Sequence, residues 1–154
     1  MNLDFASVWE MISDIVPEND ALICGDEIIS WKDYDLQSSK IATALKNAGL
    51  GPNSKAGLYL NNSNEYLIGQ NAIFKIGGVP INVNYRYVAE ELIYLLDNSD
   101  SEAVFYHACY SSRIKEISGS LPNIKAWIEI ADGTKSEFED SLKFEELLNS
   151  CDPM

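Results

Sequence analysis

Hydrophobic residues recur along this chain at two spacings, and each spacing predicts a type of secondary structure. Apolar side chains three or four positions apart predict helices over residues 5–16, 31–48, 62–76, 88–99 and 114–121, with a final turn or two at 144–148. Short apolar or alternating runs predict strands over residues 21–24, 27–30, 55–60, 79–83, 103–106 and 126–130. We expect residues 79–83 to be a buried strand and the polar residues 132–140 to be a loop.

Capping and turn residues mark the boundaries of several of these elements. Asp4 is suited to be the N-cap of the first helix. Gly25 begins a two-residue connection between the first two strands, which predicts a tight hairpin. Ser30 begins a sequence that resembles a capping box, and Asn62 with Glu65 forms a second cap-like pair.

The order of the elements predicts the fold class. From residue 55 onward, strands and helices alternate with short connections, which is typical of βαβ units with a mostly parallel sheet. We therefore predict one α/β region over residues 1–154, long enough to bury a core. Within it, residues 1–30 form a leading helix and β-hairpin, residues 31–131 form the α/β core, and residues 132–154 form an acidic C-terminal segment.

Charge narrows the choice of partners. The net charge is −13, so the chain repels the phosphates of nucleic acids and anionic lipids, and we predict no nucleic-acid partner. Residues 129–152 hold eight acidic and two basic side chains, which we interpret as a solvated acidic surface.

Cysteines and targeting signals bear on location. Cys24, Cys109 and Cys151 are odd in number and widely spaced, so neither a disulfide framework nor a zinc site is predicted. Residues 1–5 lack the basic and apolar regions of a signal peptide, and no stretch approaches the roughly 20 apolar residues of a membrane helix. The prediction is a cytoplasmic protein without a transmembrane segment.

The glycine pair Gly77-Gly78 is the first candidate for ligand chemistry. Phosphate-binding loops join the carboxyl end of a strand to the start of a helix, where backbone N–H groups and the helix dipole attract anions. This pair instead follows a predicted helix and precedes a strand. Helix capping and close packing therefore explain it better than phosphate binding does.

Three loops do follow predicted strands, at residues 61–63, 84–87 and 107–109. The first, Asn61-Asn62-Ser63, precedes a helix but has no positive side chain, so capping accounts for it. In the second, Arg86 lies between Tyr85 and Tyr87 and has the chemistry to bind a carboxylate or a phosphate. We favour a role for Arg86 in holding this loop against neighbouring structure.

Other titratable residues form no recognisable catalytic set. His107 and Cys109 are two positions apart without a third orienting group, so we favour a structural or surface role for His107 over catalysis. Glu90 and Glu91 point about 100° apart on a helix and do not face each other. We assign no catalytic, cofactor-binding or metal-binding residue, and the residues alone do not reveal a function.

Three segments nevertheless resemble the adenylate-forming synthetases, the superfamily of acyl-CoA synthetases, luciferases and peptide-synthetase adenylation domains. The segments, in the order and spacing of that family, are ISWKDY at 29–34, AGLYLNNS at 56–63, and FKIGGVPIN at 74–82 continuing as NYRY at 84–87. The last of them is most similar to fatty-acyl-CoA synthetases. One departure is Val88-Ala89, where the family often has Thr-Pro, so the next helix lacks its usual N-cap.

The resemblance implies the N-terminal part of an AMP-forming carboxylate–CoA ligase. The full family enzyme uses ATP and Mg to convert a carboxylic (fatty) acid to an acyl-adenylate, and then transfers the acyl group to CoA. The family's Ser/Thr/Gly-rich phosphate loop and its later motifs are absent up to Met154. We therefore expect no cofactor binding or adenylation by this chain alone, and a missing C-terminal remainder as its partner. The alternative is a free-standing, non-catalytic α/β binding or interaction module.

Overall fold

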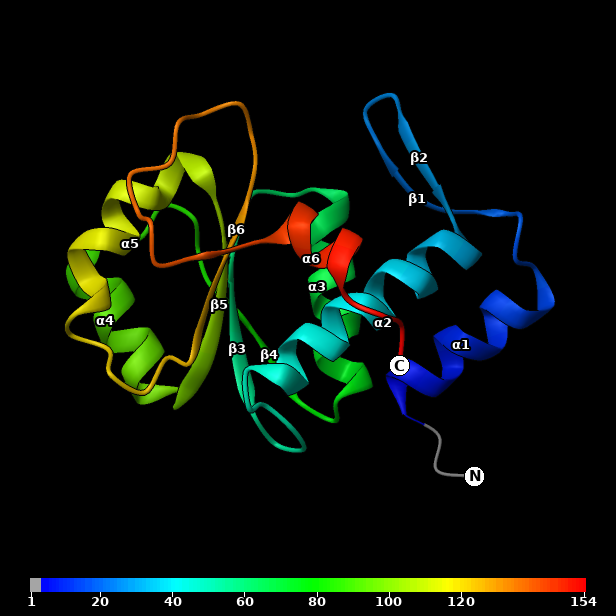
Figure 1. Cartoon of the computed structure of the whole chain (residues 1–154), viewed down its shortest axis with the longest axis horizontal. Coiled ribbons are helices and arrows are strands. Elements are labelled where there is room, and N and C mark those ends of the chain that lie inside the picture. Colours follow the sequence, from blue (N-terminus) through cyan, green and yellow to red (C-terminus); the bar gives the residue numbers. More distant parts are fainter. Residues whose placement is uncertain (1–3) are drawn as a thin grey trace.

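A five-stranded sheet with helices on both faces forms the body of the protein, and a two-stranded hairpin projects beside the first helices (Figure 1). The structure is a computed structural model that describes residues 4–154, so three of the residues assessed for a signal peptide lie outside it. The helices are α1 (Phe5–Ile15), α2 (Trp31–Asn47), α3 (Asn64–Lys75), α4 (Ala89–Asn98), the 3₁₀ turn η1 (Ala108–Tyr110), α5 (Ser111–Ser118) and α6 (Phe144–Ser150). The strands are β1 (Asp20–Cys24), β2 (Glu27–Ser30), β3 (Lys55–Tyr59), β4 (Val79–Asn82), β5 (Ser101–His107), β6 (Ala126–Ile130) and β7 (Leu142–Lys143).

The N-terminal elements form as predicted. The Asp4 carboxylate accepts a hydrogen bond from the Ser7 N–H at 2.8 Å, which caps α1. Strands β1 and β2 pair antiparallel, and Gly25 has a φ of 60° in the turn between them. Ser30 then caps α2 by accepting from the Asp33 N–H at 3.1 Å. Local sequence chemistry therefore sets these boundaries.

The predicted start of α3 is wrong by one residue. The N-cap is Ser63, whose hydroxyl accepts from the Tyr66 N–H at 3.3 Å, whereas Asn62 is exposed. Ser63 has the extended backbone that lets a side chain turn back to the helix start. The expected lack of a side-chain cap on α4 is confirmed at Val88, whose N–H instead donates to the Glu91 carboxylate at 2.9 Å.

The predicted parallel sheet is confirmed, with the strand order β4-β3-β5-β6-β7 and parallel pairing throughout. Two apolar clusters lie on its two faces. One joins the sheet to α2, α3 and α6 and includes Ile41, Leu45, Ile68 and Phe105. The other joins it to α4 and α5 and includes Leu92, Val104 and Ile114. Each layer therefore has its own core, as expected for helices that cover both faces of a parallel sheet.

The prediction that residues 79–83 form a buried strand is wrong, because β4 lies at the edge of the sheet. Val79 is 44% exposed and Asn82 is also exposed, and only Val83, just after the strand, is fully buried. Pro80 is compatible with this position, since proline lacks the N–H that an interior strand would need.

The Gly77-Gly78 pair caps α3 and packs closely, as predicted. Gly77 has a φ of 72°, and its N–H donates to the Phe74 carbonyl at 2.9 Å. A Cβ added to Gly78 would lie 2.8 Å from the Ser54 carbonyl oxygen. The pair lets the chain leave α3 and enter β4 directly against the loop before β3.

Strand β7 was not predicted, because two residues are too short to show an alternating pattern. It pairs with β6 through Ile128 opposite Leu142 and Glu129 opposite Lys143. Phe138 and Phe144 on either side of β7 are buried in the two cores. The acidic segment thus contributes to the sheet as well as to the surface. Within residues 4–154, every helix is too short or too polar to cross a membrane.

Candidate functional site at the carboxyl edge of the sheet

The strand order identifies the edge at which a ligand site is expected. The chain passes from β3 through α3 to β4 on one side, and then returns through α4 to β5 on the other side of β3. The direction of the fold therefore reverses between β3 and β5. In open parallel sheets, ligands bind beyond the carboxyl ends of the strands at such a reversal. The three loops singled out in the sequence lie at this edge.

A histidine joins the two loops at the reversal point. His107 is the last residue of β5 and is 7% exposed, and its Nδ1 accepts from the Asn61 N–H at 3.2 Å. Asn61 Oδ1 in turn accepts from the Tyr110 hydroxyl at 2.9 Å. Burial lowers the pKa of His107, which favours the neutral ring that this acceptor role requires. His107 thus connects loop 61–63 to residues 107–109. The prediction that residues 107–109 form a loop is wrong, because they are the end of β5 and the start of η1.

Cys109 lacks the properties of a nucleophile. Burial, and then the neighbouring Asp132, raise the pKa of Cys109 to about 11, so the thiol stays protonated near neutral pH. Asp132 Oδ2 accepts from the Cys109 N–H at 3.0 Å, and its Oδ1 accepts from the Thr134 N–H at 2.9 Å. Partial burial opposes ionisation of Asp132, but these hydrogen bonds lower its pKa to about 2. The Asp132 carboxylate therefore holds backbone N–H groups together.

The loop of residues 84–87, which contains Tyr85 and Tyr87 and is called the tyrosine loop below, is held by Arg113. The prediction that Arg86 holds it is wrong. Arg113 Nη1 donates to the Tyr87 carbonyl at 2.8 Å and to the Tyr59 hydroxyl at 2.9 Å. Arg86 is exposed, its guanidinium lies 5.6 Å from the centre of the Tyr85 ring, and it forms no ion pair within the described chain. Arg113 escaped the sequence analysis because it lies on α5, 26 positions from Tyr87.

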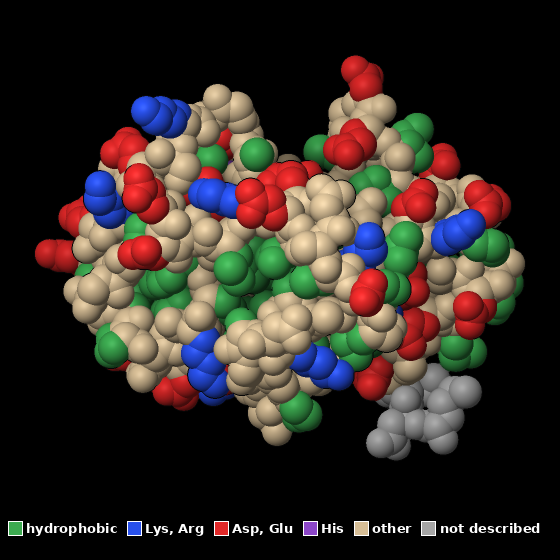
Figure 2. Space-filling view, in the orientation of Figure 1, with side chains coloured by type: hydrophobic (Ala, Val, Ile, Leu, Met, Phe, Trp, Pro, Cys, Tyr) green, Lys and Arg blue, Asp and Glu red, His purple; other side chains and the backbone are tan. Residues whose placement is uncertain are grey.

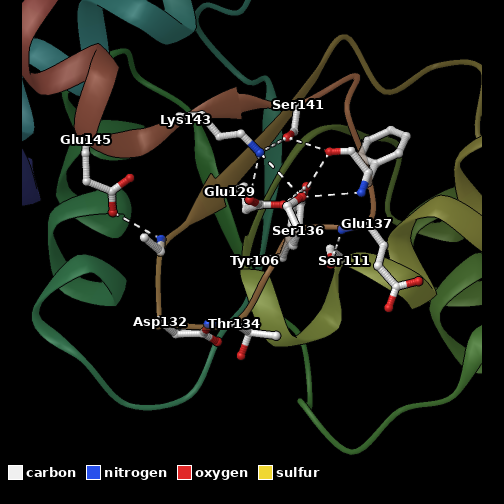
Figure 3. A network of polar contacts seen from close by, with 12 residues as sticks. Tyr106, Ser111, Glu129, Asp132, Thr134, Ser136, Glu137, Ser141, Lys143 and Glu145 are labelled. Carbon is white, nitrogen blue, oxygen red and sulfur yellow. Dashed lines mark hydrogen bonds and ion pairs between the residues drawn. The ribbon is translucent and has the colours of Figure 1, made fainter.

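A second polar cluster surrounds Glu129 on β6 (Figure 3). Glu129 is 4% exposed, so the prediction of a solvated acidic segment is wrong at this position. Its carboxylate accepts from the Tyr106 hydroxyl at 3.0 Å, from the Ser136 hydroxyl at 2.5 Å and from Lys143 Nζ at 2.7 Å. Burial raises the pKa of Tyr106 well above its usual range, which keeps this hydroxyl a donor. Both carboxylate oxygens are paired inside the chain, and the cluster fastens the loop after β6 to the sheet.

The described residues do not fit the Mg ion that the family resemblance implies. No group of three or more His, Cys, Asp or Glu side chains in residues 4–154 is placed to hold a metal. Loop 61–63 presents Asn61, Asn62 and Ser63 without a cation for a triphosphate, and its serine already caps α3. The carboxyl edge therefore supplies a shaped surface and the exposed Arg86.

The fold and this edge define an open, doubly wound α/β unit whose ligand side is the carboxyl edge of its sheet. A family model described as AMP-binding enzyme matches residues 13–153, and the chain belongs to that family.

The chain is similar to acyl-CoA ligases that are much longer than it is. It is 37% identical over 136 residues to a medium/long-chain-fatty-acid–CoA/3-oxocholest-4-en-26-oate–CoA ligase of Mycobacterium marinum, which covers 88% of this chain and 25% of the relative. It is 33% identical over 155 residues to a 3-oxocholest-4-en-26-oate–CoA ligase of Rhodococcus rhodochrous, which covers 99% of this chain and 28% of that relative. The chain thus spans about a quarter of the length of the curated relatives it matches.

Solved structures show the same fold. The anthranilate CoA ligase AuaEII, in complex with anthranoyl-AMP, superposes with a TM-score of 0.87 over 96% of this chain and 28% of that chain. Acetoacetyl-CoA synthetase from Streptomyces lividans superposes with a TM-score of 0.88 over 99% of this chain and 26% of that chain. Both are 20% identical in sequence, so they support the fold assignment alone.

Proposed function

We propose that this chain is the N-terminal part of a longer ligase that joins a fatty acid, or a related aliphatic carboxylic acid, to coenzyme A. The main support is the family match over residues 13–153. The names of the two relatives, which refer to fatty-acid and steroid-acid substrates, support the substrate class. In the proposed reaction the carboxylate attacks the α-phosphorus of ATP and pyrophosphate leaves. The thiol of coenzyme A then attacks the acyl carbon and AMP leaves.

The chain's proposed contribution is one wall of the ligand site. The bond that His107 accepts from Asn61 and the bonds that Arg113 donates join loops from β3, β4 and β5 into one surface, on which Arg86 is an exposed cation. A surface of this kind positions a substrate, but adenylation also requires converging N–H groups and a lysine or metal to stabilise the charge that develops on the triphosphate. The chain alone is therefore proposed to be inactive.

Carboxylate-dependent exchange between ATP and pyrophosphate tests this proposal. We expect no exchange by purified chain 1–154 with medium- or long-chain fatty acids, and clear exchange by the full-length protein that contains it. Reactions without fatty acid serve as the control. Exchange by the short chain would contradict its inactivity. A full-length protein that forms neither acyl-adenylate nor acyl-CoA would overturn the ligase proposal and favour the non-catalytic module.

Exposed apolar surface supports the proposal that the rest of the enzyme packs against this chain. Four apolar side chains of α1 form one exposed stripe, namely Phe5, Val8, Met11 and Ile15, which are 65%, 40%, 43% and 73% exposed. Hydrophobic side chains also gather at the hollowed middle of the face in Figure 2. A groove of about 420 Å³ is lined mainly by apolar side chains of α2, β6, β7 and α6, including Ala44, Trp127, Leu142 and Leu147.

The isolated chain should therefore self-associate. We expect its apparent mass in sedimentation velocity to rise with concentration, because association removes exposed apolar surface from water. A Phe5→Ser/Ile15→Ser variant should associate less, while Tyr94→Ser, at a 71% exposed position of α4, serves as a substitution outside the stripe. A wild-type chain that stays monomeric at all concentrations would contradict this expectation.

A further inference from the structure

The geometry points to Arg113 as the residue that positions the loop of residues 84–87 to receive a phosphate-bearing substrate. This inference rests on the proposed ligase function only for the identity of that substrate, which is ATP or coenzyme A. Arg113 is a positioning residue in this scheme, and Arg86 is the side chain that it presents.

Arg113 ties the loop to two other parts of the fold. Its Nη1 reaches from α5 to the Tyr87 carbonyl at 2.8 Å and to the hydroxyl of Tyr59, at the end of β3, at 2.9 Å. The Tyr59 hydroxyl also donates to the Tyr87 carbonyl at 3.2 Å, so this carbonyl accepts two hydrogen bonds. Tyr59 is fully buried, and its ring lies 4.6 Å from that of Tyr110. On the side of the sheet, this anchor is therefore a buried and closely packed side chain.

The loop's other polar contacts are internal. The Arg86 N–H donates to Asn84 Oδ1 at 2.9 Å, and the Tyr87 N–H donates to the Asn84 carbonyl at 3.0 Å. These bonds close a turn but do not place it relative to the sheet. Within the described chain, the hydrogen bonds that join this turn to other elements come from Arg113 and Tyr59. Removing Arg113 should therefore free the turn from the sheet and let the hydrogen bonds that close it open more often.

Arg86 has the chemistry to bind an anion at this edge. It is exposed, it has no acidic partner within residues 4–154, and it belongs to a chain with a net charge of −13. An unpaired guanidinium is well suited to bind phosphate with two parallel hydrogen bonds. Fixing the adjacent residue before binding reduces the ordering that binding must impose, and so strengthens it. The charge of Arg113 itself is directed at neutral oxygen atoms.

A double-mutant cycle in the full-length enzyme tests this inference. We expect Arg86→Ala and Arg113→Met each to raise the KM for one phosphate-bearing substrate on the order of tenfold, with the KM for the carboxylic acid unchanged. The double variant should show no further rise, because both changes remove the same interaction. Arg113→Lys should restore most of the affinity, since its ammonium group also donates hydrogen bonds. Lys115→Met is the matched control, which removes a positive charge from the same helix.

The results show whether the phosphate belongs to ATP or to coenzyme A, and they test the positioning role separately from the proposed ligase function. A rise in the KM for ATP assigns the contact to the nucleotide, and a rise in the KM for coenzyme A assigns it to the thioester-forming step. Additive effects, or a fall in kcat and melting temperature without a change in KM, would overturn the positioning role. If the wild-type enzyme is active but the effects of Arg86→Ala and Arg113→Met are not coupled, this inference alone is wrong. If the wild-type enzyme is inactive, the proposed function is wrong.

The isolated chain offers a test that does not depend on activity. Hydrogen exchange at the amides of Tyr87 and Val88 should accelerate about tenfold in Arg113→Met, while amides of β5 exchange at the wild-type rate. Unchanged exchange at these two amides would show that Arg113 does not hold the loop, and would overturn the inference.

Discussion

Replacing Gly78 with alanine should destabilise the protein by about 3 kcal/mol, near the upper end of the cost of overpacking. The added Cβ would lie 2.8 Å from the carbonyl oxygen of Ser54 and 3.1 Å from that of Ile73. Both oxygens already accept backbone hydrogen bonds, from Val79 at 2.8 Å and from Gly78 at 2.9 Å respectively. The new methyl group therefore forces backbone atoms apart where α3 passes into β4. Urea unfolding followed by circular dichroism measures the change.

The neighbouring glycine provides the matched control. Gly77 has a φ of 72°, but a Cβ there would meet the Pro52 Cα at an ordinary 3.5 Å. Gly77→Ala should therefore cost only the roughly 1–2 kcal/mol of a left-handed backbone conformation. If Gly77→Ala were as damaging as Gly78→Ala, backbone conformation rather than close packing would govern this junction.

The second large effect is expected at Lys143. Changing it to methionine leaves the Glu129 carboxylate, which is 4% exposed, without its cation. Removing the cation of a buried ion pair costs about 3–5 kcal/mol, because the remaining charge stays buried. Since the Lys143 side chain is 33% exposed, we expect a loss near the lower end, about 3 kcal/mol. The free energy of unfolding of Lys143→Met, compared with wild type in urea, measures this loss.

Two further variants distinguish a buried charge from a general loss of packing. Lys135→Met, at an exposed position of the same segment, should change stability by less than about 0.5 kcal/mol. A Glu129→Gln/Lys143→Met double variant should recover much of the loss, because no charge is then buried. A Lys143→Met variant as stable as Lys135→Met would show that the polar cluster around Glu129 in Figure 3 does not stabilise the fold.

Much of the fold was predictable because its signals are local. Asp4 and Ser30 cap helices within three residues of their own positions, and Gly77 ends α3 within one turn. The alternation of strands and helices after residue 55 was enough to predict the parallel sheet, which the pairing confirms. The start of α3 was missed by one residue, because both Asn62 and Ser63 are good N-cap residues and only the hydrogen bond that Ser63 accepts in the folded chain distinguishes them.

The candidate site was predictable only in part. The sequence located the three loops that follow strands, but it assigned the loop-holding role to Arg86 because that arginine is next to the tyrosines. Arg113 takes that role, since parallel strands bring the loops after β3, β4 and β5 to one edge, where α5 also begins. Glu129 likewise counts as one more acidic residue until Tyr106 and Lys143 are placed beside it.

The sequence by itself determined the class of fold, the caps, the glycine junction and the resemblance to adenylate-forming ligases. Each of these depends on residues that are near one another in the chain. Only the tertiary structure decided that β4 is an edge strand, that β7 extends the sheet, that Glu129 is buried and that Arg113 anchors the tyrosine loop. These features depend on which segments lie side by side. The spacing of apolar residues within a segment does not show which other segments pack beside it.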